Sequence, residues 1–186
     1  LLLSLLVGVT SIVIALPLAI WVAWVLARRN FWGKAALNAL VHLPLVLPPV
    51  VTGYLLLISF GRTGPVGILL ENTFGVVLAF RWTGAVLAAV VMGFPLMVRA
   101  IRLAIEAVDP KLEQAAYTLG APDFAVFRTV TLPLILPGIL AGGVMGFAKA
   151  IGEFGATITF VANIPGETQT LPSAIYTMLQ VPGGEE

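Results

Sequence analysis

The sequence contains no cysteine and only one histidine, His42, among its 186 residues. The absence of cysteine excludes disulfide frameworks, thiolate metal sites and cysteine nucleophiles. One histidine cannot build a multi-histidine metal site. Its position two residues before Pro44 is more typical of a packing or interfacial residue than of a proton carrier. We therefore expect neither a metal nor a cofactor bound by this chain.

Charge is also scarce, because only 10% of the residues are charged while 59% are hydrophobic. The mean hydropathy is +1.04, which is far above that of a soluble domain. Ten Lys and Arg against nine Asp and Glu give a formal net charge of +1, so no overall field favours nucleic acid as a partner. The composition predicts an all-α polytopic membrane protein.

Motifs for ATP binding and for hydrolytic chemistry are missing as well. The sequence has no G-x-x-x-x-G-K-[ST] phosphate loop, no H-E-x-x-H and no G-x-S-x-G. An intramembrane enzyme is therefore disfavoured. A secondary transporter would normally carry several intramembrane acids for ion coupling, and only Glu153 qualifies. Both classes stay as less favoured alternatives.

Long stretches without charge identify the membrane spans, since a bilayer core about 30 Å thick needs roughly 20 apolar residues of helix. We expect a single transmembrane domain over residues 1–186, with spans at about 1–27, 35–60, 82–105 and 131–153. The third span continues through Arg99 and Arg102, whose long side chains can reach the interface. Residues 63–80 indicate an external loop with one short helix, and residues 161–186 a polar, turn-rich tail.

Basic residues are distributed unevenly between the two ends of these spans. Seven of the ten lie on one predicted side: Arg28, Arg29, Lys34, Arg99, Arg102, Lys111 and Arg128. The positive-inside bias places residues 28–34 and the loop at about 107–131 in the cytoplasm, and the tail outside.

Two segments share the pattern LPLxLP, at residues 43–48 and 132–137. Prolines four residues apart remove amide donors from one helical face, so they either begin the helix or kink it. Pro49 reinforces the first copy. The second is followed by small residues that permit close helix packing, which are Gly138, Gly142, Gly143 and Gly146.

The cytoplasmic loop has the signals of two short helices. Asp109 can cap a helix that begins at Pro110, Gly120 can end it, and a second helix restarts at Pro122. Small and apolar side chains on the first helix predict a shallow dent that receives another protein: Leu112, Ala115, Ala116 and Leu119. A helical hairpin that packs on its own bundle is the alternative explanation.

Polar residues within the spans suggest a transport pathway. Lys149 and Glu153 lie four apart on one helical face, so we expect them to pair inside the bundle or at the mouth of a pore. Neutral donors in the spans suit transient solvation of a polar solute, and the candidates are Thr52, Tyr54, Thr157 and Thr159. Alternatively, such hydroxyls bond only to the preceding helical turn.

The loop resembles the EAA loop of ABC importer permeases, in which E-A-A is followed by three residues, Gly, nine residues and I-x-L-P. Here the pattern is Gln114-Ala115-Ala116, Gly120 and then Val130-Thr131-Leu132-Pro133, with both spacings kept. Gln114 replaces the acid of the pattern and Val130 replaces its Ile. Glu113 offers an acid next to Gln114, rotated by about 100° around the helix.

Three further segments resemble the molybdate-type permease subunit, so that the resemblance covers nearly the whole chain: "HLPLVLPPVVTGYLLL", "MGFPLMVRAIRLAIEAVDPKLEQAA" and "GEFGATITFVANIPGETQTLPSAIY". Sulfate and thiosulfate permeases have similar loops, so tungstate, sulfate and thiosulfate stay open as substrates. The resemblance implies the type I importer fold, with a fifth span expected beyond "PGGE". It also implies a homodimer in a bacterial or archaeal inner membrane.

The same resemblance implies two kinds of partner. Two copies of a cytoplasmic ABC ATPase would bind ATP and Mg, and an extracytoplasmic binding protein would deliver the oxyanion. The residues implied to couple with the ATPase are Glu113, Gln114, Ala115, Ala116, Gly120, Leu132 and Pro133.

Overall fold

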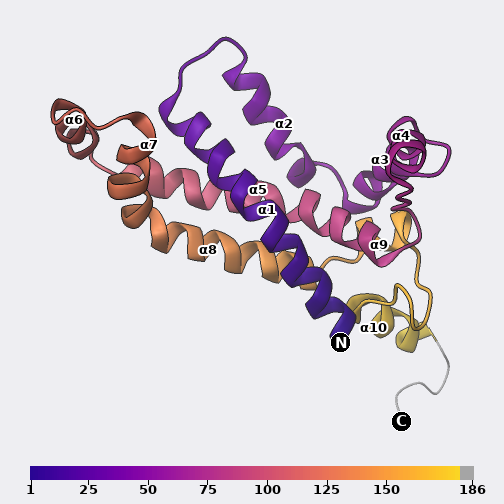
Figure 1. Ribbon diagram of the computed structural model, residues 1–186. Helices are drawn as coiled ribbons and strands as arrows, with labels where there is room; N and C mark the ends of the chain where they lie inside the picture. Colours follow the sequence, from indigo (N-terminus) through magenta and orange to yellow (C-terminus); the bar gives the residue numbers. More distant parts are fainter. Residues whose placement is uncertain (181–186) are drawn as a thin grey trace.

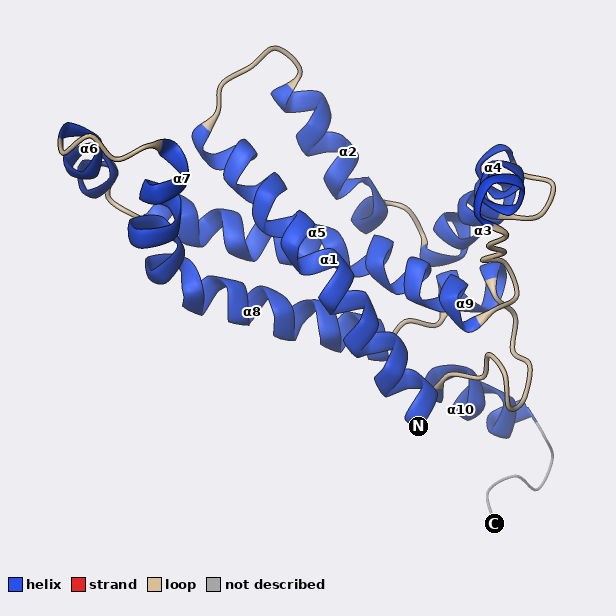
Figure 2. Ribbon diagram, viewed as in Figure 1, coloured by secondary structure: helices blue, strands red, loops and turns tan. Residues whose placement is uncertain are grey.

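The computed structural model describes residues 1–180, and every regular element in that range is helical (Figure 2). In chain order the helices are α1 (Leu2–Arg28), α2 (Lys34–Val46), α3 (Pro49–Phe60), α4 (Pro65–Phe74), α5 (Trp82–Ala107), α6 (Pro110–Thr118), α7 (Asp123–Val126), the π-helix η1 (Phe127–Thr131), α8 (Leu132–Ile151), α9 (Gly155–Phe160) and α10 (Leu171–Gln180). The expected all-α class is confirmed. The expected fifth span lies outside the described residues.

Helix α5 lies at the centre of the bundle and packs along both α1 and α8 (Figure 1). Its side chains Met97, Ile101 and Ile105 are almost fully buried. Small residues bring α8 close to α5, as predicted, since a Cβ atom added at Gly146 would lie 2.8 Å from the sulfur of Met97. Gly143 differs, because it faces open space.

Three helical stretches are long and apolar enough to cross a membrane, namely Leu2–Arg28, Trp82–Ala107 and Asp123–Ile151. The predicted span at 35–60 is not one straight helix, because α2 and α3 meet at an angle of 115°. Leu47 and Pro48 both adopt extended backbone between them. Each of these two residues precedes a proline, which disfavours the helical conformation. The tandem prolines Pro48-Pro49 therefore break the helix.

The second LPLxLP segment does not break its helix, because Pro137 lies within the continuous helix α8. The short helix that begins after Pro122 was expected to belong to the loop and to be separate from the span. It instead continues through η1 into α8. The wide turn of η1 comes directly before Leu132-Pro133. The missing amide and the ring of Pro133 disfavour the usual i→i−4 register there.

The two ends of the bundle carry different elements (Figure 1). Helices α6 and α7 lie at the end where α1 finishes, whereas α4, α9 and α10 lie at the other. There the amide of Leu171, at the start of α10, donates to the Ser4 hydroxyl at 2.7 Å. Segments predicted to be cytoplasmic thus share one end, and the predicted external segments share the other.

Cysteine labelling should identify which end faces the cytoplasm. Thr118 and Glu167 are exposed at opposite ends, and no native cysteine interferes. Because of the charge bias, we expect Glu167→Cys to react with an impermeant maleimide in intact cells, and Thr118→Cys only after permeabilisation. The reverse pattern would show that the orientation is wrong.

Candidate functional site

The loop between α5 and α8 is built by the local signals found in the sequence. The Asp109 carboxylate accepts a hydrogen bond from the amide of Lys111 at 2.9 Å and so caps α6. Gly120 ends this region in the left-handed conformation with φ of +82°. Both features confirm the predicted helix boundaries. The angle between α6 and α7 therefore depends on a backbone conformation that glycine adopts at little cost.

The outer surface of this loop is apolar and exposed. Leu119 is 88% exposed, Phe124 73% and Leu112 49%, and Gln114 and Ala115 beside them are also exposed. Such large apolar side chains at a polar end of the bundle are typical of a surface that receives another protein. Desolvation, together with the nearby carboxylate of Asp123, raises the pKa of Tyr117 above its ordinary value.

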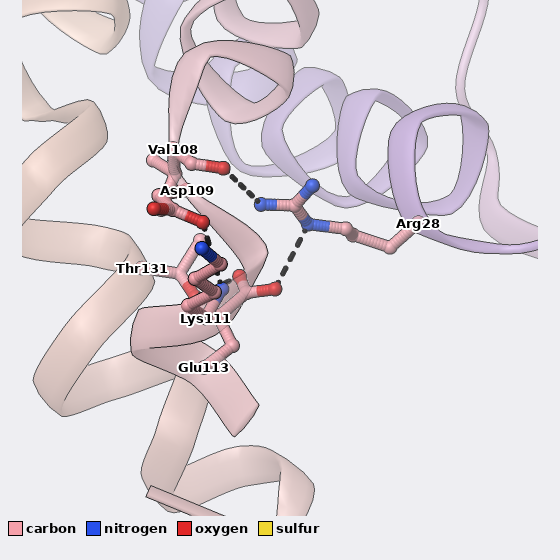
Figure 3. Close-up of polar contacts among 6 residues, drawn as sticks. All are labelled: Arg28, Val108, Asp109, Lys111, Glu113 and Thr131. Atoms are coloured by element: carbon pink, nitrogen blue, oxygen red, sulfur yellow. Dashed lines mark hydrogen bonds and ion pairs between the residues drawn. The ribbon is translucent and has the colours of Figure 1, made fainter. Parts of the chain in front are cut away.

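Glu113 points away from that surface and ties α6 to the end of α1 (Figure 3). Its Oε2 lies 3.1 Å from Nε of Arg28, and its Oε1 accepts a 2.7 Å hydrogen bond from the Thr131 hydroxyl. Arg28 also donates to the carbonyl of Val108 at 3.2 Å. Both charged side chains are mostly buried, at 19% and 13% exposure. One arginine thus connects α1, the end of α5 and α6, and Thr131 adds the start of α8.

The next residue, Arg29, makes the equivalent connection to α7. Its Nη2 lies 3.0 Å from Oδ2 of Asp123, and its guanidinium stacks over the ring of Trp24. Trp24 in turn contacts Phe127 edge to face, with ring centroids 6.5 Å apart. Consecutive arginines at the end of α1 therefore hold both short helices of the loop.

The structure separates the predicted coupling residues into two groups. Gln114, Ala115 and Gly120 are exposed on the loop, whereas Glu113 is directed inward and Leu132 packs against the core. From the sequence alone, Arg28 and Arg29 are only topology signals. Because Arg29 and Asp123 are 94 residues apart, no local pattern reveals the pairing. The only available signal for this pairing was that basic and acidic residues both occur at the same predicted end of the bundle.

Lys149 and Glu153 form the second cluster, at the end of α8. Their side chains pair at 2.7 Å, which confirms the predicted contact. Glu153 is only 2% exposed. Its other oxygen accepts a 2.9 Å hydrogen bond from the amide of Ala156, a contact that was not predicted. The carboxylate therefore also fixes the turn between α8 and α9.

Helix α9 crosses α3 at very close range. A Cβ atom added at Gly53 would lie 2.6 Å from the carbonyl oxygen of Ala156, and one at Gly155 would lie 2.7 Å from Cβ of Pro49. Helices α3 and α9 are thereby packed together beside Glu153. Glycine is required at this crossing because backbone meets backbone.

The predicted neutral donors lie around this crossing with different exposures. Thr52 and Thr157 are buried, whereas Tyr54 is 56% exposed. The hydroxyls of Thr52 and Thr159 donate to backbone carbonyls one turn earlier, as isolated helical hydroxyls often do. Within residues 1–180, no group of three His, Cys, Asp or Glu side chains is arranged to hold a metal ion.

Comparisons with known proteins cover almost the whole chain. Residues 15–180 match the family described as "Binding-protein-dependent transport system inner membrane component". The molybdenum transport system permease protein ModB of Escherichia coli K12 is 64% identical over 184 residues, covering 99% of this chain and 80% of that protein. The corresponding protein of Haemophilus influenzae is 61% identical with the same coverage.

A more distant relative is the probable sulfate transport system permease protein cysT of Chlorella vulgaris. It is 35% identical over 159 residues, which are 86% of this chain and 59% of that protein. Both kinds of relative are named as permease components of transport systems, and the family match covers most of the helical bundle. This chain belongs to the family of binding-protein-dependent transport system inner-membrane components.

Proposed function

We propose that this chain is the membrane-spanning subunit of an ATP-driven importer that carries molybdate into the cytoplasm. The observation that carries this proposal is the identity of 64% over 99% of the chain to a molybdenum transport permease. Identity to the sulfate-type relative is only 35%. Tungstate, sulfate and thiosulfate are the competing cargoes.

The energy would come from two copies of a cytoplasmic ABC ATPase, because this chain has no phosphate loop of its own. ATP and Mg would be bound by those subunits. The exposed surface of α6 and α7, with Gln114, Ala115 and Leu119, supports docking of an ATPase at this end. The family description supports delivery of the anion by a binding protein at the opposite end. A second copy of the chain would complete the pore.

The anion path would pass near the α3–α9 crossing, with selectivity left to the binding protein. Buried Thr52 and Thr157 are neutral, and the nearby Lys149 is already neutralised by Glu153. A site of this kind solvates a dianion weakly, so that the anion can leave again. An uncompensated cluster of cations at the same depth would retain it.

Stimulation of ATP hydrolysis identifies the cargo directly. The permease, purified with its ATPase in lipid, is mixed with the binding protein loaded in turn with molybdate, tungstate, sulfate or thiosulfate. We expect the molybdate-loaded protein to stimulate hydrolysis most. Stimulation by the sulfate-loaded protein alone would assign the chain to sulfate, and no stimulation by any of the four would contradict the proposed function.

The Arg28–Glu113 pair gives a prediction on how the loop transmits movement. Glu113→Gln removes the charge but keeps an acceptor for Thr131, so α6 should stay folded while losing its fixed connection to α1. We expect ATPase co-purification to persist and the number of anions imported per ATP hydrolysed to fall severalfold. Leaving Arg28 unpaired should also cost about 1 to 3 kcal/mol of stability.

The exposed pair Arg29 and Asp123 serves as the matched comparison. Its side chains are 55% and 64% exposed, so Asp123→Asn should change coupling much less than Glu113→Gln. Unchanged transport per ATP in Glu113→Gln would mean that this buried pair has no part in coupling.

A further inference from the structure

A polar cavity of about 340 Å³ lies between α2 and α5, and its lining includes no residue of the docking surface or of the Lys149–Glu153 cluster. Its lining residues are Asn38, His42, Arg99, Arg102, Leu103 and Glu106. Asn38 and His42 lie one turn apart in the middle of α2, and the other four lie in the last three turns of α5. The cavity is therefore close to the end of the bundle that the charge bias places in the cytoplasm.

The charges in this cavity do not balance. Arg102 is held by Glu106 at 2.7 Å and by the side-chain oxygen of Asn38 at 3.0 Å. Arg99 has neither an ion pair nor a hydrogen bond with another side chain of residues 1–180. Two guanidinium groups thus face one carboxylate, and the cavity has a net positive charge.

Arg99 lies within the predicted third membrane span, and it is exposed. Arg99 precedes the last residue of α5, Ala107, by eight positions, which corresponds to about 12 Å along the helix. A guanidinium at such a depth in a membrane span normally pairs with an anion or reaches the interface. Here it opens into a cavity that can hold an anion as its counter-charge.

The polar groups beside Arg99 have fixed orientations. Nδ1 of His42 lies 2.8 Å from the carbonyl oxygen of Asn38, so this nitrogen carries the proton and the ring orientation is fixed. Glu106 and Asn38 similarly fix the guanidinium plane of Arg102. Planar guanidinium groups bind tetrahedral oxyanions with paired, charge-assisted hydrogen bonds.

We propose that this cavity binds a tetrahedral oxyanion group, with Arg99 as its main ligand and Arg102 as a second donor. The same chemistry has two sources, the transported oxyanion as it leaves the pore and the phosphate of an anionic lipid of the cytoplasmic leaflet. The first source rests on the proposed function, whereas the second does not. In either case Glu106 weakens the site and lets the anion exchange.

Direct binding to the permease–ATPase complex tests this site without requiring transport. One arm measures equilibrium binding of radiolabelled inorganic molybdate in detergent, without nucleotide or binding protein. The other arm reconstitutes the complex in vesicles of phosphatidylglycerol and phosphatidylcholine, and counts phosphatidylglycerol retained after mild extraction by native mass spectrometry. The variants are Arg99→Gln, Arg99→Lys and, as a control, Arg128→Gln, which removes an exposed arginine from the same end.

Arg99→Gln should lower binding about tenfold in one of the two arms, because a charge-assisted hydrogen bond is lost. Arg99→Lys should retain part of the binding, and Arg128→Gln should behave as wild type. Loss in the molybdate arm assigns the site to the cargo, and loss in the lipid arm assigns it to a headgroup. Equal binding by wild type and Arg99→Gln in both arms, or an equal loss in Arg128→Gln, would overturn the proposal.

Discussion

Replacing Gly120 by valine should leave the permease in the membrane but abolish anion uptake and ATPase co-purification. Gly120 has φ of +82°, and a Cβ atom there would meet no other atom within 4 Å. The strain therefore comes from the backbone alone and amounts to about 1 to 2 kcal/mol for an ordinary residue, and more for a β-branched one. The loop relieves it by changing the angle between α6 and α7, which moves the exposed docking surface.

Gly166→Val is the matched control for this prediction. Gly166 has the same φ of +82° and equally open surroundings, but it lies in the segment before α10, at the other end of the bundle. It should therefore show the same backbone strain with normal ATPase co-purification. Wild-type co-purification and uptake for Gly120→Val would mean that the loop is only a hairpin that packs on its own bundle.

Replacing Glu153 by leucine should abolish transport and lower the melting temperature of the purified permease. The change leaves Lys149 without its partner and the amide of Ala156 without its acceptor. Breaking a buried ion pair costs on the order of 3 kcal/mol. Glu153→Gln should be milder, because its amide oxygen still accepts from Ala156. Thermal unfolding and uptake of both variants provide the comparison.

The charge-swapped double variant separates the two tasks of Glu153. With Lys149→Glu and Glu153→Lys combined, the ion pair can form again, but a lysine at 153 cannot accept the hydrogen bond from Ala156. We therefore expect partial rescue of stability and little rescue of uptake. Full rescue would show that the turn contact is unimportant, and no rescue of either property would show that pairing is not what matters.

Features that depend on neighbouring residues were predictable from the sequence. Asp109 caps α6 and Gly120 ends it because both effects act within one helical turn. Lys149 and Glu153 meet because a spacing of four places them on one helical face. Charge-free stretches similarly located the long helices α1, α5 and α8.

Features that depend on distant segments were not predictable. Arg28 and Glu113 meet only because α5 returns the chain to the end of α1, and helical periodicity carries no information on that encounter. The two LPLxLP segments show a second limit. Their shared pattern suggested similar helices, but Pro49 adds a second consecutive proline to the first copy and turns a kink into a break of 115°.

Uptake by the reconstituted importer measures ATP-driven molybdate import directly. The permease and its ATPase are placed in vesicles with ATP on the ATPase side and molybdate-loaded binding protein on the other, and radiolabelled molybdate is followed over time. We expect accumulation that requires both ATP and the binding protein. Accumulation without ATP, driven by an ion gradient, or ATP-driven accumulation of sulfate but not molybdate, would contradict it.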